Sequence, residues 1–557
     1  MAAVTVARAD DSKISPELRN LPSSQQAQVQ VIVQYAPGTQ LNCSGLFGLI
    51  GCVVNDVLQL GGAILGQLPL INGLVALLDG NGIVSLSNQS NVVYISQDRP
   101  LTPSVNNAAS AVNAEFAWQS NYTGAGVGVA LIDSGVSANL DLNQGILPVS
   151  RVVYQQSFVP GNSRSSDQYG HGTHIAGLIA GDGLSSTGWL FSKTFKGIAP
   201  RANIVNLRVL DANGGATDSQ VIAAIQQAIS LKSRYNIRVI NLSLGRGVYE
   251  TYKLDPLCQA VEAAWHNGIV VVVAAGNNGR YQPTNGYATV TSPGNDPYVI
   301  TVGAMKTMGT PTRVDDLIAS YSSKGPTVVD RIVKPDLVAP GNLLVSLEAP
   351  GSTLYNQLSA NRVPYSYYVN GGSSASSSSY FRLSGTSMAT GVVSGVVADL
   401  LQKSPRLTPD QVKARLMKTA WKSFPAYSSV TDPATGITYT DQYDVFTVGA
   451  GYVDLEAALI NTDIAKGSAM SPTATYDPHT GKVYISNNPS AVWNSSSTWA
   501  YSSVWGSAEF MSGMPEVSGS NALWGSNALW GSNALWGSNA LWGSNALWGS
   551  NALGGEK

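Results

Sequence analysis

The stretch VGVALIDSGV (127–136) joins an unbroken apolar run to an aspartate and a glycine turn. An apolar run without alternating polar residues is typical of a strand that is buried on both faces of a parallel sheet. Four comparable runs follow, and helix-like stretches separate them. We therefore expect an α/β domain over residues 104–462, a parallel sheet with helices on both faces. The further strands are expected at 203–210, 238–244, 269–276 and 298–304, and the helices at 219–231, 256–268, 386–403 and 408–420.

The beginning of the chain predicts a second, smaller unit. Residues 1–103 are expected to form a small α+β domain, with strands at 29–35 and 92–96 and a helical element at INGLVALL (71–78). Asn, Gln and Asp interrupt the apolar residues 46–78, so we expect core-forming elements there rather than a membrane span.

The end of the chain is repetitive. Residues 463–519 are rich in Ser, Asn and Trp and are expected to form a linker, and within 520–557 the hexad SNALWG occurs five times and SNALGG once. Trp493, Trp499 and Trp505 are also six residues apart, which predicts degenerate hexads before the perfect ones. The tail fits a disordered low-complexity segment or a small β-type solenoid, and exposed indoles are suited to contact with a surface, polymer or partner.

Charge and cysteine content narrow the possible classes of protein. The 557-residue chain is 44% apolar and 12% charged, with a formal net charge of −2. It has no long basic or acidic block that would indicate nucleic acid or an anionic membrane as a partner.

Cys43 and Cys52 are either bridged in an oxidising compartment or two buried thiols, and Cys258 is expected to be a packed thiol. The first twenty residues lack the apolar stretch of a secretory signal, so either a signal has been removed or the protein is not exported by that route.

Three residue types with a place in amide hydrolysis stand at strand ends and helix starts. Hydrolysis by a serine needs a base for the hydroxyl proton, a carboxylate that orients the base, and donors for the developing oxyanion. Asp133 ends a predicted parallel strand, where α/β proteins bind ligands. His171 lies at the start of the small-residue helix in YGHGTHIAGLIAG (169–181), and Ser387 at the start of a long apolar helix in LSGTSMATG (383–391). Asp133 and Ser387 taken singly also fit turn or helix caps, so the combination carries the prediction.

Other polar residues bear on the same region. Asn277 closes the run IVVVVAAGN, where its amide can donate to an oxyanion or form an Asn-Asn-Gly turn. His171 and His174 lack the third ligand of a zinc helix, so no metal is assigned to them. His174 is expected to be structural, and His266 and His479 are given no role.

The motifs DSGV, HGTHIAG, AAGNNG and SGTSMATG, in this order, resemble the signatures of the subtilisin-like serine proteases, or subtilases. NLSLG (241–245) is similar to the substrate-binding strand of that family, and GIAP (197–200) and VAPG (338–341) are similar to two of its recurrent loops. The resemblance implies a subtilisin-like fold for the large domain and the activity of a serine endopeptidase.

The resemblance also implies a role for each matched residue. Ser387 is the nucleophile, His171 the general base and then acid, and Asp133 the residue that orients His171. Asn277 and the backbone N–H of Ser387 form the oxyanion hole. The residues implied to pair with the substrate backbone are Ser243, Leu244 and Gly245, and those implied to line the primary specificity pocket are Ala274, Ala275 and Gly276.

Maturation and partners follow from the same resemblance. Residues 1–103 resemble an inhibitory propeptide, which autocleavage between about 97 and 106 would release. Substrates are expected to be extended or unfolded protein segments, because main-chain pairing reads a strand largely regardless of sequence. The enzyme is expected to be a secreted monomer whose chemistry needs no cofactor; calcium is common in the family, but no ligand loop can be matched here. The alternative is a surface-attachment protein that depends on its Trp-repeat tail and whose protease only matures it.

Two features depart from the family pattern. The family usually has Ser-Pro-His after the SMA triplet, where this chain has Thr390, Gly391 and Val392. We expect altered packing behind the nucleophile rather than lost activity. The Tyr- and Ser-rich segment between Gly351 and Ser387 is longer than usual and is expected to shape the rim of the cleft.

Overall fold

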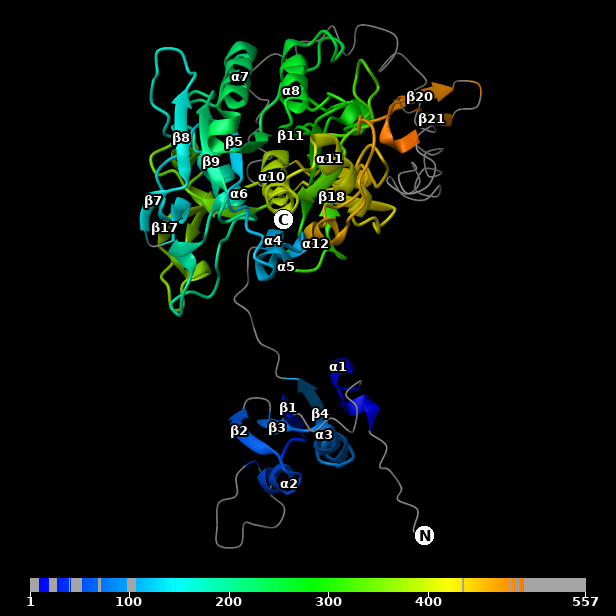
Figure 1. Ribbon diagram of the computed structural model, residues 1–557. Helices are drawn as coiled ribbons and strands as arrows, with labels where there is room; N and C mark the ends of the chain where they lie inside the picture. The colour runs from blue at the N-terminus through cyan, green and yellow to red at the C-terminus, as the bar shows by residue number, and fades with distance from the viewer. Residues whose placement is uncertain are drawn as a thin grey trace. The chain divides into compact units, whose positions relative to one another are not determined.

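The chain forms two compact units, Met1–Thr102 and Pro103–Lys557, each of which is described here by itself. Figure 1 shows the computed structural model with its helices and strands labelled. The structure describes residues 10–19, 28–39, 41, 53–68, 72–97, 107–145, 147–432, 435–477, 479, 482–486, 488 and 490–494.

The N-terminal unit contains a four-stranded antiparallel sheet, the helices α2 and α3 that connect its strands, and a short preceding helix, α1 (Pro16–Arg19). The strand order is β2-β3-β1-β4, and alternate residues Val31, Val33 and Tyr35 are buried in its core. The succession βαββαβ with this order is that of a ferredoxin-like unit. Its elements are β1 (Val29–Tyr35), α2 (Val53–Gln59), β2 (Ala63–Leu68), β3 (Gly73–Leu78), α3 (Gly80–Ser87) and β4 (Val92–Gln97).

The predicted helical element at 71–78 is wrong. Strand β3 occupies Gly73–Leu78, and it pairs with both β1 and β2. Leu74, Ala76 and Leu78 are buried at every second position, which is the period of a strand. The apolar run is too short for its sequence to separate a strand from a buried helix. The helix is α3, and its N-cap Asp79 accepts a hydrogen bond from the N–H of Gly82.

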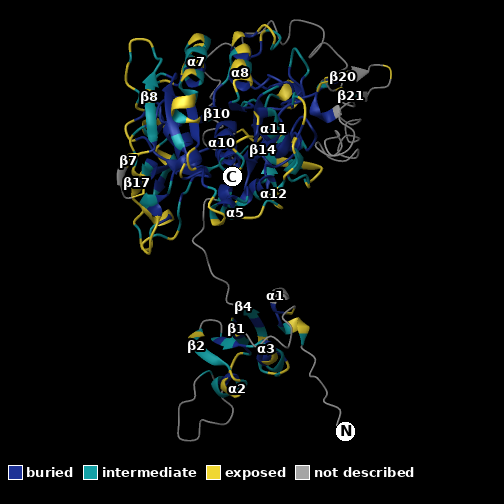
Figure 2. Cartoon of the chain, viewed as in Figure 1, coloured by how far each residue is buried: buried dark blue, intermediate teal, exposed yellow. Residues whose placement is uncertain are grey.

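The larger unit is built on an eight-stranded sheet in the order β13-β12-β11-β10-β5-β9-β8, with β14 paired to β12. Every pairing in it is parallel except that of β12 with β13. All residues of β5, β11 and β12 are buried, and the centre of the unit is dark blue in Figure 2. The predicted α/β fold is therefore confirmed. The strands are β5 (Gly128–Asp133), β8 (Val152–Ser157), β9 (Asn203–Arg208), β10 (Ile237–Leu242), β11 (Val270–Ala274), β12 (Ile300–Lys306), β13 (Leu317–Ile318) and β14 (Leu337–Pro340).

Helices cover this sheet in packed pairs. Helix α6 packs against α10, and α7 packs against α8. The four predicted helices are confirmed. Helix α7 ends at Tyr235 rather than at the predicted residue 231, because the residue that ends it is Asn236, in a left-handed conformation. The helices are α4 (Asn107–Ala111), α5 (Ala114–Gln119), α6 (His171–Ala180), α7 (Asp218–Tyr235), α8 (Pro256–His266), α10 (Thr386–Lys403), α11 (Pro409–Thr419) and α12 (Leu455–Ile460), besides α9, which is described below.

The long segment before Ser387 forms structure of its own. It contributes the central strand β17 and the outer strand β16 of a three-stranded antiparallel sheet in the order β15-β17-β16. Phe195, Tyr368 and Tyr380 pack edge to face against one another, and Tyr380 lies on β17. The elements are β15 (Leu344–Leu347), α9 (Thr353–Gln357), β16 (Arg362–Pro364) and β17 (Ser376–Leu383).

The segment after residue 462 is not a linker over its described part. Strands β20 (Thr473–Asp477) and β21 (Lys482–Ser486) form a hairpin. Trp493 is only 3% exposed, lies in a core with Phe446, and donates from Nε1 to the carbonyl of Met470 at 2.6 Å. Trp493 is thus a core residue of the larger unit, which the composition of the segment could not reveal.

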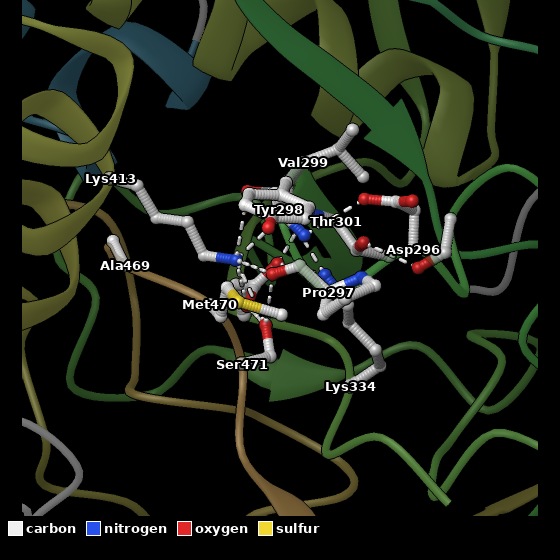
Figure 3. A network of polar contacts seen from close by, with 12 residues as sticks. Asp296, Pro297, Tyr298, Val299, Thr301, Lys334, Lys413, Ala469, Met470 and Ser471 are labelled. Carbon is white, nitrogen blue, oxygen red and sulfur yellow. Dashed lines mark hydrogen bonds and ion pairs between the residues drawn. The ribbon is translucent and has the colours of Figure 1, made fainter. Parts of the chain in front are cut away.

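A network of buried charged and polar side chains joins the chain after residue 462 to the rest of the larger unit (Figure 3). The carboxylate of Asp336 accepts from Nζ of Lys334 at 2.7 Å and lies 3.0 Å from Nζ of Lys413 on α11. The hydroxyl of Ser471 also donates to Asp336 and accepts from Lys413 at 2.9 Å. The chain after residue 462 is therefore hydrogen-bonded to both α11 and Asp336, the residue directly before β14.

Some predictions concern residues outside the described ranges. These are the pairing of Cys43 with Cys52, the cleavage region after Gln97 and the hexad tail 520–557. Cys258 is a buried free thiol whose Sγ lies 3.4 Å from Oδ1 of Asn295, which confirms its packed state. Within the described ranges, no helix combines the length and the apolar character that crossing a membrane requires.

Candidate active site

The site begins where β5 ends and α6 starts. Asp133 is the last residue of β5, and His171 is the first residue of α6. Nδ1 of His171 lies 2.8 Å from Oδ1 of Asp133, and the two side chains are 1% and 0% exposed. A Cβ atom at position 172 would lie 2.3 Å from the carbonyl oxygen of Gly135, so the close approach of helix and strand requires a glycine there.

Asp167, which no sequence motif indicated, holds this junction. The buried carboxylate of Asp167 accepts from the N–H groups of Gly170 at 2.6 Å and Thr173 at 2.8 Å. It also accepts from the hydroxyl of Ser134 at 2.8 Å, while that hydroxyl accepts from the N–H of Gly172 at 2.8 Å. Asp167 therefore accepts from N–H groups at the start of α6 that have no partner within the helix, and it fixes the position of His171, the first residue of that helix. An aspartate four residues before a predicted helix is the signal that could have identified it.

The surroundings of His171 raise its pKa. Burial by itself lowers the pKa of His171, but the charge of Asp133, its hydrogen bond and the charge of Asp167 outweigh burial and raise that pKa above its ordinary value. The imidazole is thus more basic than an isolated histidine.

His174 behaves in the opposite way. Its Nε2 lies 3.1 Å from the carbonyl of Leu344 and 3.2 Å from that of Phe381. Burial and the neighbouring His171 lower the pKa of His174 to about 3, so this ring is neutral. The expected structural role agrees with this geometry, since His174 joins α6 to the β15-β17-β16 sheet.

Asn277 meets the first turn of α10. Its Oδ1 accepts from the N–H of Thr386 at 2.9 Å and from the hydroxyl of Thr386 at 3.1 Å. With Oδ1 so engaged, the amide presents Nδ2 as its donor. Ser387 is the second residue of α10, so its N–H has no acceptor within the helix. The residue before the helix, Gly385, has φ +152°, a conformation that favours glycine.

Ser387 and Ser243 are hydrogen-bonded to each other twice. The hydroxyl of Ser387 donates to the carbonyl of Ser243 at 3.2 Å, and the hydroxyl of Ser243 donates to the carbonyl of Ser387 at 3.0 Å. Ser243 directly follows β10, so the predicted nucleophile is attached to the predicted substrate-binding segment. The structure therefore brings Asp133 to His171, Asn277 to the turn of Ser387, and Ser387 to Ser243.

Thr291 is a second residue that the sequence analysis missed. A side chain on Gly245 would begin 2.6 Å from Oγ1 of Thr291, and one on Gly276 would begin 3.0 Å from its Cγ2. Gly276 has φ +107°, in the left-handed region. The N–H of Thr291 donates to the carbonyl of Ala275 at 3.1 Å. Thr291 thus lies between the two segments that are implied to bind the substrate, and nothing local in its sequence marks it.

Arg246 fixes the end of the segment that the resemblance implies to bind the substrate. Its guanidinium donates to Asp218 at the start of α7 at 2.9 and 3.0 Å and to Asp255, the N-cap of α8, at 2.8 Å. Its backbone exchanges two hydrogen bonds with Ser292. Both bonds to Asp218 come from Nε, and Nη2 lies 2.8 Å from Oδ2 of the same carboxylate. Two nitrogens of the guanidinium thus contact Asp218, which sets position as well as charge.

The residues that depart from the family pattern lie inside the helix packing. Thr390 donates from Oγ1 to the carbonyl of Thr386 at 2.8 Å, within α10. A side chain on Gly391 would begin 3.3 Å from Cγ2 of Ile175, so the glycine lets α10 and α6 approach closely. Val392 is wholly buried.

No calcium or other metal ligand set emerges from the described ranges, in which no group of three or more His, Cys, Asp and Glu side chains could hold an ion. The calcium that the resemblance suggested is therefore given no ligands, and no step of the chemistry is routed through a metal.

Comparison with known proteins gives a consistent set of relatives. Residues 124–451 match the model of the Subtilase family. Serine protease AprX of Bacillus subtilis (strain 168) is 37% identical over 342 residues, which cover 59% of this chain and 70% of the relative. Subtilisin E of the same organism is 34% identical over 367 residues, 65% of this chain and 78% of the relative. A solved structure, the crystal structure of a cold adapted subtilisin-like serine proteinase, is 32% identical and covers 54% of this chain and 84% of that chain, with a TM-score of 0.37.

Proposed function

The chain belongs to the subtilase family of serine endopeptidases, and from this premise we propose that Asp133, His171 and Ser387 are its catalytic triad. The observation that carries the proposal is the 2.8 Å contact between Nδ1 of His171 and Oδ1 of Asp133, two side chains closed off from solvent. A carboxylate at Nδ1 holds the proton there and leaves the lone pair of a general base on Nε2.

In the proposed reaction, Oγ of Ser387 attacks the scissile carbonyl carbon while its proton passes to Nε2 of His171. The tetrahedral intermediate collapses when His171 gives that proton to the leaving amine, which leaves an ester on Ser387. Water then hydrolyses the ester by the same proton transfers, and Ser387 is regenerated. Asp133 stays ionised and stabilises the imidazolium, and the steps need no cofactor.

The proposed oxyanion hole consists of Nδ2 of Asn277 and the N–H of Ser387. The support is the engagement of Oδ1 of Asn277 by Thr386, which aims the amide donor away from the helix. Donors that are already oriented stabilise the developing charge without reorganising.

The proposed substrates are extended or unfolded protein segments. Residues 243–245 follow β10 and would pair antiparallel with the substrate backbone, and Ala274, Ala275 and Gly276 would line the pocket for the residue before the scissile bond. Backbone pairing selects an extended chain rather than a particular sequence. Thr291, between the two segments, would limit the depth of that pocket.

We further propose a secreted, self-processing zymogen in which residues 1–103 form an inhibitory propeptide. Two observations support it: the N-terminal residues form their own α+β unit, and the division between the units at Thr102 and Pro103 falls in the expected cleavage region. The enzyme would act as a monomer after cleavage.

The second candidate is attachment to a surface or polymer through the tail, with the protease serving only to mature the protein. It is favoured by a Trp and a Leu in each of the five SNALWG hexads. Removal of residues 520–557 tests it: retention on cells or matrix should fall while casein hydrolysis persists, and unchanged retention would contradict it.

The triad is tested with the full-length chain and its Ser387→Ala variant. The wild type should hydrolyse casein, react once with phenylmethylsulfonyl fluoride, and carry the adduct on Ser387 in a peptide mass map. Ser387→Ala should do none of these and should remain uncut between 97 and 106. Casein hydrolysis or cleavage by the purified variant at the wild-type rate would overturn the assignment.

A further inference from the structure

We propose that Ser394 and Asn241 are positioning residues for the nucleophile, which they reach through Ser243. The inference rests on the proposed role of Ser387 and deepens it, because it assigns a task to two residues that touch neither substrate nor the reacting atoms.

Buried side chains form a continuous hydrogen-bonded chain behind Ser387. Oγ of Ser394 donates to Oδ1 of Asn241 at 2.9 Å, and Nδ2 of Asn241 donates to Oγ of Ser243 at 3.0 Å. Oγ of Ser243 then donates to the carbonyl of Ser387 at 3.0 Å. Ser394, Asn241 and Ser243 are 0% exposed, so water does not compete for these bonds.

Each bond fixes the direction of the next. The amide of Asn241 has one oxygen, and because Ser394 donates to it, the NH2 group faces Ser243. Ser243 accepts that bond, so its single proton goes to the carbonyl of Ser387. Without the hydroxyl of Ser394, the amide of Asn241 can turn over and accept from Ser243 instead, and the proton of Ser243 is then withdrawn from Ser387.

The chain starts and ends on the same helix. Ser387 and Ser394 are seven residues apart on α10, so both lie on one face of it. Asn241 and Ser243 are two residues apart at the end of β10, so they project to one side of the sheet. The hydrogen bonds thus leave α10 two turns after the nucleophile and return to it at the nucleophile.

A serine is unexpected at position 394, because its neighbours in α10 are buried and apolar. It lies in the run VVSGVV, where all residues from Val392 to Val397 are buried. A hydroxyl inside a helix ordinarily donates to the carbonyl four residues earlier, as Thr390 does to Thr386. Ser394 donates to a different element instead, although alanine would fill an apolar helix at less cost.

The consequence is a fixed position for Ser387. Its carbonyl is held by Ser243, and its hydroxyl donates to the carbonyl of Ser243 at 3.2 Å. Reacting atoms must approach to within about 3–3.5 Å with correct alignment, and a misplacement of about 1 Å can cost about 100-fold in rate. Backbone pairing with the substrate does not involve Ser394. Its loss should therefore lower kcat and leave KM nearly unchanged.

The experiment compares the full-length wild type with Ser394→Ala, Ser394→Thr and a matched control, Ser471→Ala. Ser471 also loses a buried hydroxyl with hydrogen bonds, but it belongs to the Asp336 network. With a peptide p-nitroanilide, and active enzyme counted by phenylmethylsulfonyl fluoride titration, Ser394→Ala should lose about 10-fold in kcat with KM within about twofold. Its rate of sulfonylation should fall in parallel. Ser394→Thr keeps the hydroxyl and should recover most of kcat, and Ser471→Ala should keep kcat within about twofold.

Urea unfolding of all four proteins separates positioning from stability. A Ser394→Ala protein with the kcat and sulfonylation rate of the wild type overturns the proposal, and so does a loss that Ser471→Ala shares. Should Ser394→Ala not accumulate, Ser394→Cys replaces the hydroxyl with a weak donor of similar shape, and a wild-type kcat for it overturns the proposal equally. A wild type that neither hydrolyses the substrate nor is sulfonylated refutes the proposed function instead, so the two failures are distinguishable.

Discussion

Nδ1 of His171 lies 2.8 Å from Oδ1 of Asp133, and this contact opposes the effect of burial on the pKa of the imidazole. Burial acts to lower the pKa of His171, and the charge and hydrogen bond of Asp133 act to raise it, with the net result above the ordinary value. A general base must be neutral, so activity is lost as the pH falls through this raised pKa. The acid limb of the pH profile therefore depends on Asp133.

Replacing Asp133 with Asn should lower kcat by about 10⁴-fold, because the amide no longer holds the imidazole in the required tautomer. The acid limb of kcat/KM should also move to lower pH, since burial then acts on His171 without the opposing charge. The measurement is a pH profile of peptide p-nitroanilide hydrolysis. Asp463→Asn, which removes an exposed partner of Lys418, is the control and should change neither quantity. An acid limb that stays in place would contradict this account.

Thr291 should set the size of the substrate residue before the scissile bond. Its Oγ1 and Cγ2 occupy the space next to Gly245 and Gly276, so Thr291→Gly deepens the pocket by a hydroxyl and a methyl group. One methylene in a pocket is worth about 1–3 kcal/mol of discrimination. The ratio of kcat/KM for Phe over Ala substrates should therefore rise by about 10-fold or more.

Thr291→Ser is the matched control, since it removes only the methyl group and should give a smaller rise. Equal ratios in the wild type and Thr291→Gly would mean that the side chain does not face the bound substrate.

The predicted α/β fold is confirmed where its information is local, and the residues of the candidate site could be named for the same reason. Asp133 and Asn277 follow apolar runs long enough to be strands, and His171 and Ser387 open helices, so the carboxyl edge of one parallel sheet had to bring them together. Thr291 and Asp167 were missed because each acts on a segment distant in sequence, and a single residue type carries no mark of that contact. Trp493 was misassigned because its spacing matches the hexads while its burial depends on the core around Phe446.

Asp336→Asn should destabilise the larger unit by about 3–5 kcal/mol, because it leaves two buried lysines, Lys334 and Lys413, without their carboxylate. These lysines hold the pKa of Asp336 below its ordinary value against burial, which acts to raise it. A depressed folded-state pKa contributes stability that is present above the unfolded pKa, about 3.9, and is lost as the pH falls through the folded value. This acid-sensitive part of the stability should be missing in Asp336→Asn.

Urea unfolding midpoints between about pH 3 and pH 7 check this prediction. They should be measured in a Ser387→Ala background, so that autolysis does not intervene. Asp463→Asn again serves as the control, because Asp463 is an exposed carboxylate whose loss should cost at most about 1 kcal/mol. A midpoint for Asp336→Asn equal to that of the control would show that Lys334 and Lys413 do not need the charge.

Asn277 provides a graded test of the oxyanion hole. In subtilisin, removal of the side-chain donor at the oxyanion hole costs about 10²–10³-fold in kcat, and we expect a loss of that order for Asn277→Ala with KM nearly unchanged. Thr386→Val removes the hydroxyl that donates to Oδ1 of Asn277 at 3.1 Å but keeps the N–H that donates at 2.9 Å. Its amide is still held by one bond, so the loss should be smaller, about 10-fold or less.

Asn278→Ala, at the next residue, is the control and should retain kcat. Steady-state kinetics on titrated enzyme gives the order wild type, Thr386→Val, Asn277→Ala. A Thr386→Val loss as large as that of Asn277→Ala would show that the threonine acts otherwise than by orienting the amide, because a correctly aimed donor needs only the remaining N–H to keep its direction.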